Sequence, residues 1–257
     1  MWVSTEPTDV RLGHAVRVDR SRTYLLGAAA VGAIVVVVVL IVLASGGSSG
    51  TSANAGTTAT GTTATGTAAT PTALSLSGIP QHGDTLGRAT APVTIQVFED
   101  PQCPYCREWN LGTLPTVVQK YVRTGKVKLV YRGINIIGPN SENGLRANYA
   151  AGEQNRLWQM SDELYARQGE ENSGWINDTT IASAAKAAGV NVDSLSAALS
   201  TAPVTRMLKD AGVAATSYAV AGTPTFIVQA PPALPTQLQL SALDPASFSA
   251  ALDPLLQ

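Results

Sequence analysis

The sequence has little cysteine and little charge, and both shortages narrow what the chain can be. Two cysteines occur among 257 residues, which excludes a mini-domain held by several disulfides and any metal site built from four cysteines. Charged residues make up 14% of the chain, compared with roughly 25% in an average soluble protein. The formal net charge is −1 and no cluster of Lys and Arg stands out. We therefore expect no nucleic-acid partner, because such partners are held through basic patches.

Charge is missing above all from a stretch near the N-terminus. Residues 24–44 are uncharged and apolar, and about 20 such residues suffice for a helix to cross a membrane. Four arginines occur in residues 1–23, and no further Lys or Arg occurs before Arg88. By the positive-inside rule we expect a cytoplasmic tail at 1–23, a single-pass anchor in the cell membrane at 24–44 and an extracytoplasmic remainder. The alternative is a signal peptide cleaved near Ala44, which would release a secreted protein.

Large apolar residues are also absent from the segment that follows. Residues 45–72 consist of Gly, Ser, Thr and Ala apart from Asn54 and Pro71, and a five-residue unit of the type GTTAT occurs three times in succession. Such a composition offers nothing to offset the entropy cost of ordering the chain. We therefore expect a flexible linker at 45–82 and a folded domain at 83–257.

The pattern of the folded domain is that of an α/β protein. Apolar and β-branched residues at 91–98 and 127–131 predict two strands, and apolar residues at helical spacing between 111 and 122 predict a helix that Pro115 kinks. Strand, helix and strand in this order form a βαβ unit with parallel strands. The remaining expected elements are an all-helical insertion at about 141–218, a strand at 225–229, a partner strand at 237–240 and a last helix at 245–255.

Helix boundaries within the insertion are expected from capping residues. Asp178 is the expected N-cap of a helix at 179–188, with Gly189 just past its end. Asp193 is expected to cap a short helix that ends at Ser200, and Pro203 to open the next one. These signals predict several short helices rather than one long bundle.

Both cysteines of the chain lie in the segment Cys103-Pro104-Tyr105-Cys106, between the first strand and its helix. The N-terminus of a helix carries partial positive charge and unpaired N–H groups, which stabilise a thiolate. Pro104 suits the first turn because its missing N–H costs nothing there. We expect Cys103 to be the exposed nucleophile with a lowered pKa, and Cys106 to be the more buried thiol that resolves mixed disulfides.

Other uses of the two cysteines fit less well. A Cys-x-x-Cys pair is half of a zinc site, and only His82 and carboxylates could complete it. A purely structural disulfide would close a very small loop and would constrain little. We therefore expect a redox-active pair that needs no metal and no cofactor.

Three segments resemble a known family. The sequence FEDPQCPYCREW between a strand and a helix resembles the active site of the thioredoxin fold, and Gly222-Thr223-Pro224-Thr225-Phe226 resembles its cis-proline loop. Residues 127–168 resemble the helical insertion of DsbA-like thiol-disulfide oxidoreductases, most closely the membrane-anchored bacterial branch. The resemblance covers about 83–257. It implies a thioredoxin-like fold with an all-helical insertion, a cis Pro224 that faces Cys103, and backbone groups at Thr223 that pair with an extended substrate.

The active-site segment departs from the family pattern at two points. The dipeptide between the cysteines is Pro104-Tyr105, where strongly oxidising periplasmic members have Pro-His, and Tyr105 offers only a neutral hydroxyl. Many relatives carry an acid in the strand at the position that Val97 occupies here. Glu99 and Asp100 are the nearest acids, and either could accept a proton from Cys106, the alternative being that both belong to a solvated turn.

The resemblance implies an enzyme that exchanges disulfides outside the cytoplasm. We expect a dithiol oxidase that introduces disulfides into secreted or envelope polypeptides, with a quinone-linked membrane partner that reoxidises it. Two alternatives remain open. The same residues could serve a disulfide reductase or isomerase, or the domain could be a redox-inactive module that binds peptides as a chaperone.

Overall fold

A computed structural model describes residues 74–256 of the chain. The expected tail, the expected anchor and most of the expected linker lie outside these residues. Within the described part, every helix is too short or too polar to cross a membrane. The fold begins before residue 83, because Leu76 and Ile79 are buried in the core and Arg123 donates to the carbonyl oxygens of Ser75 and Ser77. The expected end of the linker at residue 82 is therefore too late.

The centre of the fold is a six-stranded sheet in the order β1-β2-β4-β3-β5-β6. Strands β3 and β4 are parallel, which confirms the predicted βαβ unit, and all other neighbours are antiparallel. The two-residue strands β1 and β2 were not predicted, because a run so short carries no periodicity. The strands are β1 (Gln81–His82), β2 (Thr85–Leu86), β3 (Val93–Glu99), β4 (Val127–Gly133), β5 (Thr225–Gln229) and β6 (Thr236–Gln237).

The crossover helix between β3 and β4 is not a continuous α-helix. It consists of α2 (Pro104–Glu108), a π turn at Trp109–Thr113, α3 (Leu114–Val117) and a second π turn at Val118–Val122. Pro115 has no N–H to donate, and its ring crowds the carbonyl four residues earlier. The first π turn lies directly before this proline, so the predicted disturbance takes the form of a widened turn.

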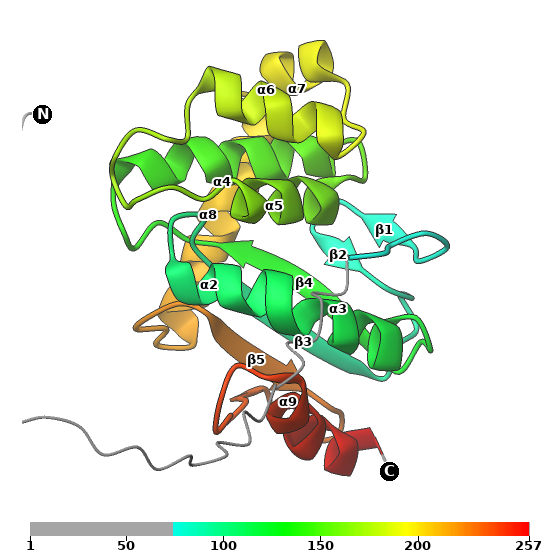
Figure 1. Cartoon of the computed structure of the whole chain (residues 1–257). Coiled ribbons are helices and arrows are strands. Elements are labelled where there is room, and N and C mark those ends of the chain that lie inside the picture. Colours follow the sequence, from blue (N-terminus) through cyan, green and yellow to red (C-terminus); the bar gives the residue numbers. More distant parts are fainter. Residues whose placement is uncertain (1–73, 257) are drawn as a thin grey trace, which may run out of the picture. The chain divides into compact units, whose positions relative to one another are not determined.

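Helices cover both faces of the sheet, as Figure 1 shows. The crossover helix and α9 (Pro245–Leu252) lie on one face, and a short 3₁₀ segment at Asp253–Leu256 follows α9. Helix α8 (Ala202–Ser217) runs behind the sheet in Figure 1 and packs on β4. The other helices of the insertion are α4 (Pro139–Gly152), α5 (Leu157–Ala166), α6 (Asp178–Ala187) and α7 (Val192–Ala198).

The N-caps of α6 and α7 differ from the prediction. The side chain of Asn177 accepts a hydrogen bond from the backbone N–H of Thr180, and that of Asn191 accepts one from Ser194. Asp178 and Asp193 therefore lie in the first turn of each helix instead of at its cap. The amide oxygen and the carboxylate both suit these positions, so composition alone could not separate them.

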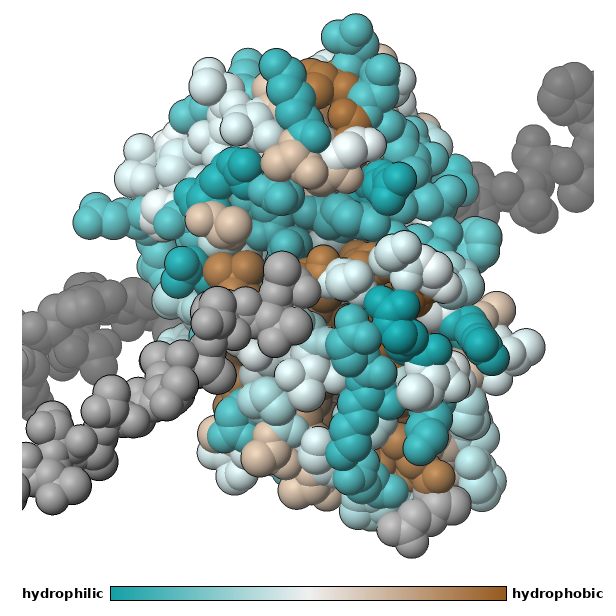
Figure 2. All heavy atoms as spheres, turned by 45° about the vertical axis from the view of Figure 1, so that its right-hand side comes forward, coloured by the Kyte–Doolittle hydropathy of each residue, from teal (hydrophilic) through white to brown (hydrophobic). Residues whose placement is uncertain are grey.

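One hydrophobic core joins the sheet to the helices on both faces. Trp109 is fully buried and stacks on Phe248, with Phe226 packed against its edge. On the face shown in Figure 2, hydrophilic side chains predominate and apolar atoms show in smaller patches. The large hydrophobic residues that are exposed in the described part are Tyr105, Ile136, Val213, Leu234 and Leu255.

Candidate active site

The two cysteines lie at the start of the crossover helix, a few residues after the end of β3. Cys103 is the N-cap of α2, and Pro104 occupies the first helical position. Both thiols are free. Cys106 is fully buried and Cys103 is only 4% exposed, so the expected open exposure of Cys103 is wrong. The reason is the loop before β5, whose Thr223 carbonyl oxygen lies 3.2 Å from Cys103 Sγ and accepts a hydrogen bond from it when Cys103 is protonated.

The two thiols differ sharply in acidity. The pKa of Cys103 is lowered to about 6, mainly by the hydrogen bond that the Cys106 thiol donates to it, against the opposing effect of burial. Backbone N–H groups of Cys106 and Tyr105 at the start of α2 contribute further. The helix N-terminus thus lowers the pKa of Cys103, as predicted, although the hydrogen bond from the Cys106 thiol lowers it more. Burial raises the pKa of Cys106 well above its ordinary value, so Cys103 alone is a thiolate at neutral pH.

The residues between the cysteines face outward. Pro104 is exposed and the side chain of Tyr105 is 62% exposed. Tyr105 is therefore available to a partner at the rim of the site and contributes its backbone N–H, not its hydroxyl, to the Cys103 thiolate.

Glu99 is the last residue of β3 and is fully buried beneath the cysteines. The alternative of a solvated turn is therefore wrong for Glu99. Burial raises its pKa to about 8, and the side chains of Asn110, Trp109 and Tyr165 oppose this shift. The charge of Glu99 in turn raises the pKa of Cys106. Ionised Glu99 therefore disfavours ionisation of Cys106, and the charge of Cys103 raises the pKa of Glu99.

Asp100 is also fully buried, yet it is engaged elsewhere. Its carboxylate accepts hydrogen bonds from the backbone N–H groups of Gln102, Ile136 and Ile137 and from the Ser141 hydroxyl, at 2.6–2.9 Å. These bonds fasten the active-site turn to the β4–α4 loop and to the start of α4. Asp100 therefore has a structural role. Both of its carboxylate oxygens already accept two hydrogen bonds each, so the structure does not support the prediction that it exchanges a proton with Cys106.

The segment opposite the cysteines comes from far along the chain. The Thr223–Pro224 peptide bond is cis, as the resemblance implied. Pro224 begins the approach to β5, which pairs with β3. The sheet thus brings Thr223 against Cys103 although 120 residues separate the two in sequence.

Two residues of the site were missed from the sequence. The amide of Asn110 donates to Glu99 and to the carbonyl oxygen of Cys106, and the hydroxyl of Tyr165 reaches the backbone carbonyl of Asp100 and the Glu99 carboxyl. A polar residue four positions after Cys106, on a helix face that is otherwise apolar, was a usable signal for Asn110. Nothing in the sequence links Tyr165 on α5 to this site.

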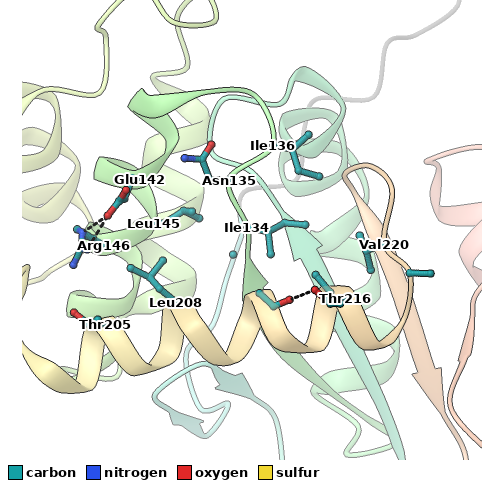
Figure 3. A pocket seen from close by; sticks show the side chains of 14 residues that line it. Ile134, Asn135, Ile136, Glu142, Leu145, Arg146, Thr205, Leu208, Thr216 and Val220 are labelled. Atoms are coloured by element: carbon teal, nitrogen blue, oxygen red, sulfur yellow. Dashed lines mark hydrogen bonds and ion pairs between the residues drawn. The ribbon is translucent and has the colours of Figure 1, made fainter. Parts of the chain in front are cut away.

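A groove of about 770 Å³ opens between α8, α4 and the β4–α4 loop (Figure 3), and neither cysteine lines it. Its apolar lining residues include Ile134, Ile136, Leu145, Leu208 and Val220. At one end Arg146 forms an ion pair with Glu142. The described residues contain no cluster of three or more His, Cys, Asp or Glu side chains that could hold a metal ion.

Comparisons with known proteins agree with this geometry. A family profile described as thioredoxin matches residues 81–238. The probable disulfide bond formation protein D of Bacillus cereus is 34% identical over 40% of this chain and 48% of its own length. The disulfide bond formation protein D of Bacillus subtilis is 25% identical over 44% of this chain and 50% of its own. The chain thus spans about half the length of these curated relatives.

Solved structures show the same fold. Oxidised BdbD from Bacillus subtilis matches with a TM-score of 0.58 and 18% identity, over 69% of this chain and 97% of that one. A thioredoxin-like oxidoreductase from Silicibacter pomeroyi matches with a TM-score of 0.53 and 26% identity, over 68% of this chain and 91% of that one. The arrangement of the sheet and the helical insertion is therefore shared with proteins of distant sequence.

Proposed function

The chain belongs to the thioredoxin family, and from that premise we propose that it is a DsbA-like thiol-disulfide oxidoreductase that works as a dithiol oxidase. The observation that carries the proposal is the asymmetry of the two thiols beneath the Thr223 carbonyl. A lowered pKa at Cys103 stabilises the reduced protein, and a stabilised reduced form makes the disulfide a strong oxidant. The names of the Bacillus relatives support the same direction.

The reaction begins with the disulfide form. A substrate thiolate attacks Cys103 Sγ, the bond between the two cysteine sulfurs breaks, and Cys106 leaves and takes up a proton. A second substrate thiolate then attacks the substrate sulfur of the mixed disulfide, and Cys103 leaves as the thiolate that its surroundings stabilise. The substrate loses two electrons and gains a disulfide, and the enzyme ends as the dithiol. Glu99, buried beside the pair, is the group that supplies the proton to Cys106.

The substrates we propose are thiol-containing secreted or envelope polypeptides. The exposed Pro104 and Tyr105 and the backbone of Thr223 offer a rim on which an extended segment can lie, with main-chain pairing of the kind that extended peptides use. Reoxidation of the dithiol then requires an electron acceptor, and we propose a quinone-linked partner in the membrane.

We further propose that the domain is extracytoplasmic and anchored by residues 24–44. The uncharged segment and the four arginines before it support this orientation. Protease added to intact cells should remove the domain from the full chain. Protection of the domain until the membrane is opened would contradict the orientation, and a mature protein that starts after Ala44 would contradict the anchor.

The oxidase activity is tested with the oxidised full chain and a reduced peptide that carries two cysteines. We expect disulfide formation by the wild type, none by Cys103→Ser, and a trapped mixed disulfide with Cys106→Ser. If the activity persists in Cys103→Ser, the cysteine pair is not its source, and the alternative of a redox-inactive peptide-binding module would be favoured. A reduction potential near about −120 mV supports the oxidase, whereas one near about −270 mV would favour a reductase.

A further inference from the structure

Asn110 is a buried amide at the junction of Glu99 and Cys106. Its Nδ2 donates to Glu99 Oε1 over 2.8 Å and to the carbonyl oxygen of Cys106 over 3.0 Å. A backbone carbonyl can only accept, so the amide must present its NH₂ group on this side. The orientation of Asn110 is therefore fixed by the backbone of the resolving cysteine itself.

This contact makes the two oxygens of Glu99 unequal. Oε1 already receives an N–H of Asn110, so a proton on that oxygen would confront another donor. Oε2 has only a long contact with the hydroxyl of Tyr165, at 3.5 Å. That hydroxyl lies closer to the Asp100 carbonyl oxygen, at 3.1 Å, so a proton on Oε2 meets the weaker donor. The proton of the neutral carboxyl therefore resides on Oε2. Tyr165 belongs to the same buried cluster as Cys103 and Cys106, so Oε2 contacts a side chain that also packs with the two thiols.

The local backbone places Asn110 there. It is the second residue of the π turn at Trp109–Thr113, and π turns within α-helices occur frequently at functional sites. In this widened turn the Asn110 amide contacts Glu99, the last residue of β3. The neighbouring Trp109 packs against Phe248 in the aromatic core. A single side chain thus ties the position of Glu99 to the main chain of Cys106.

We propose that Asn110 is a positioning residue that keeps the Glu99 proton on Oε2, from which it passes to Cys106 when the disulfide opens. The proposal rests on the proposed function. In the step, a bond forms between the substrate sulfur and Cys103 Sγ, and the bond between Cys103 and Cys106 breaks. The Cys106 thiolate takes the proton from Glu99, which becomes the carboxylate that Asn110 stabilises through Oε1. In the reverse direction Glu99 takes the proton back before Cys106 attacks.

The groups that surround Glu99 fix the sign of the expected effect. Cys103 and Cys106 face it from α2, Tyr165 from α5 and Tyr131 from β4, and the charge of Glu99 raises the pKa of Cys106 and of both tyrosines. The adjacent Asp100 is held by its own donors. Among the hydrogen bonds that favour ionised Glu99, that from Asn110 has the largest effect on its pKa. Its loss therefore raises the pKa of Glu99 further.

The test compares Asn110→Leu with Thr113→Val. Leucine has a similar size and no donor, and Thr113 is a buried polar residue on the same π turn whose hydroxyl donates to the Leu243 carbonyl oxygen and does not contact Glu99. The measurement is the pH dependence of the rate at which Cys106 releases a mixed disulfide from Cys103 in the full chain. We expect the midpoint to move up by about one pH unit in Asn110→Leu, which slows release about tenfold at pH 7, and to stay unchanged in Thr113→Val.

A second measurement reads the carboxyl directly and needs no turnover. The infrared band of the protonated Glu99 carboxyl, identified by its absence in Glu99→Gln, should move to higher frequency in Asn110→Leu because the C=O at Oε1 loses its hydrogen bond. It should stay in place in Thr113→Val. If Asn110→Leu fails to fold, Asn110→Ser serves in both measurements.

An unchanged midpoint together with an unchanged carboxyl band, or equal changes in both variants, would overturn the role of Asn110. Failure of the proposed function has a different signature, because the wild type itself would then form no mixed disulfide with substrate. Alkylation of Cys103 provides a further check, and we expect its pH midpoint to be the same in wild type and Asn110→Leu.

Discussion

Glu99 and Asp100 are consecutive buried carboxyl groups with opposite surroundings. Asp100 accepts four hydrogen bonds, three of them from backbone N–H groups. Glu99 receives two from side chains, one of them at 3.5 Å. Fixed backbone donors hold the Asp100 side chain in place, whereas Glu99 has fewer partners and burial raises its pKa. The number of donors, rather than burial, distinguishes the surroundings of these two acids.

The largest predicted effect is the loss of stability when the Asp100 carboxylate is removed. Asp100→Ala leaves four donors of the active-site turn, the β4–α4 loop and α4 without their acceptor, three of them backbone groups that cannot turn away. We expect a loss of roughly 3–5 kcal/mol in the free energy of unfolding, measured by urea denaturation. Asp100→Asn, which keeps an acceptor oxygen, should lose less. A loss under about 1 kcal/mol in Asp100→Ala would remove the contrast with Glu99.

The Glu99 side should respond to pH instead. Burial raises the pKa of Glu99 in the folded state to about 8, whereas an unfolded glutamate has its ordinary pKa of 4.5. The folded state thus binds more protons between these values, and stability falls as pH rises, at roughly 1.4 kcal/mol per pH unit. Glu99→Gln removes this slope.

Urea denaturation of the disulfide forms at several pH values measures the difference. We expect Glu99→Gln to gain on the wild type by up to about 3 kcal/mol between pH 5 and pH 7, while the two proteins behave alike near pH 4. Parallel profiles would mean that Glu99 titrates like an ordinary carboxyl, and the distinction between the two acids would then fail.

A third prediction tests whether the surroundings of Cys103 and Cys106 are independent of the hydrogen bonds around Asp100. The main cause of the low pKa of Cys103 is the hydrogen bond from Cys106, so Cys106→Ala should raise the midpoint of the Cys103 thiolate by about one pH unit. The ultraviolet absorbance of the thiolate reports this titration. Ser141→Ala removes a donor from the Asp100 side and should leave the midpoint unchanged, and a similar shift in both variants would show that the two regions are coupled.

The smallest effect is expected where the two regions meet. Tyr165 places its hydroxyl 3.1 Å from the Asp100 carbonyl oxygen and 3.5 Å from Glu99 Oε2. Tyr165→Phe should cost roughly 1 kcal/mol of stability and raise the pKa of Glu99, because one bond that favours the carboxylate is lost. Denaturation and the infrared band of Glu99 measure these two changes. A loss as large as that of Asp100→Ala would show that the hydroxyl, not the backbone donors, holds this region together.

The sequence predicts the elements that have strong local patterns. Alternating and β-branched residues identify β3, β4 and β5, and capping residues place α6, α7 and the start of α8 to within a residue or two. The two-residue strands β1 and β2 exist only because β4 offers them partners, and no local pattern encodes that.

The active site divides in the same way. The spacing of Cys103 and Cys106 identifies the pair, and Gly-Thr-Pro at 222–224 identifies the facing loop through its resemblance to a family. Burial of Cys103 and Glu99, and the partners of Asp100, depend on contacts between segments 36 to 120 residues apart. Such contacts decide pKa values, and a reading of neighbouring residues cannot supply them.

The π turn in the crossover helix changes how this chain should be aligned with others. A π turn adds one residue to a helical turn, so every position after Trp109–Thr113 is offset against an uninterrupted α-helix. A gapless alignment with a relative whose helix is regular would equate Leu114 or Val117, which follow the first π turn, with residues on another side of that helix. Transfer of residue roles along this helix therefore needs a one-residue gap at each of its two π turns, placed by comparing coordinates.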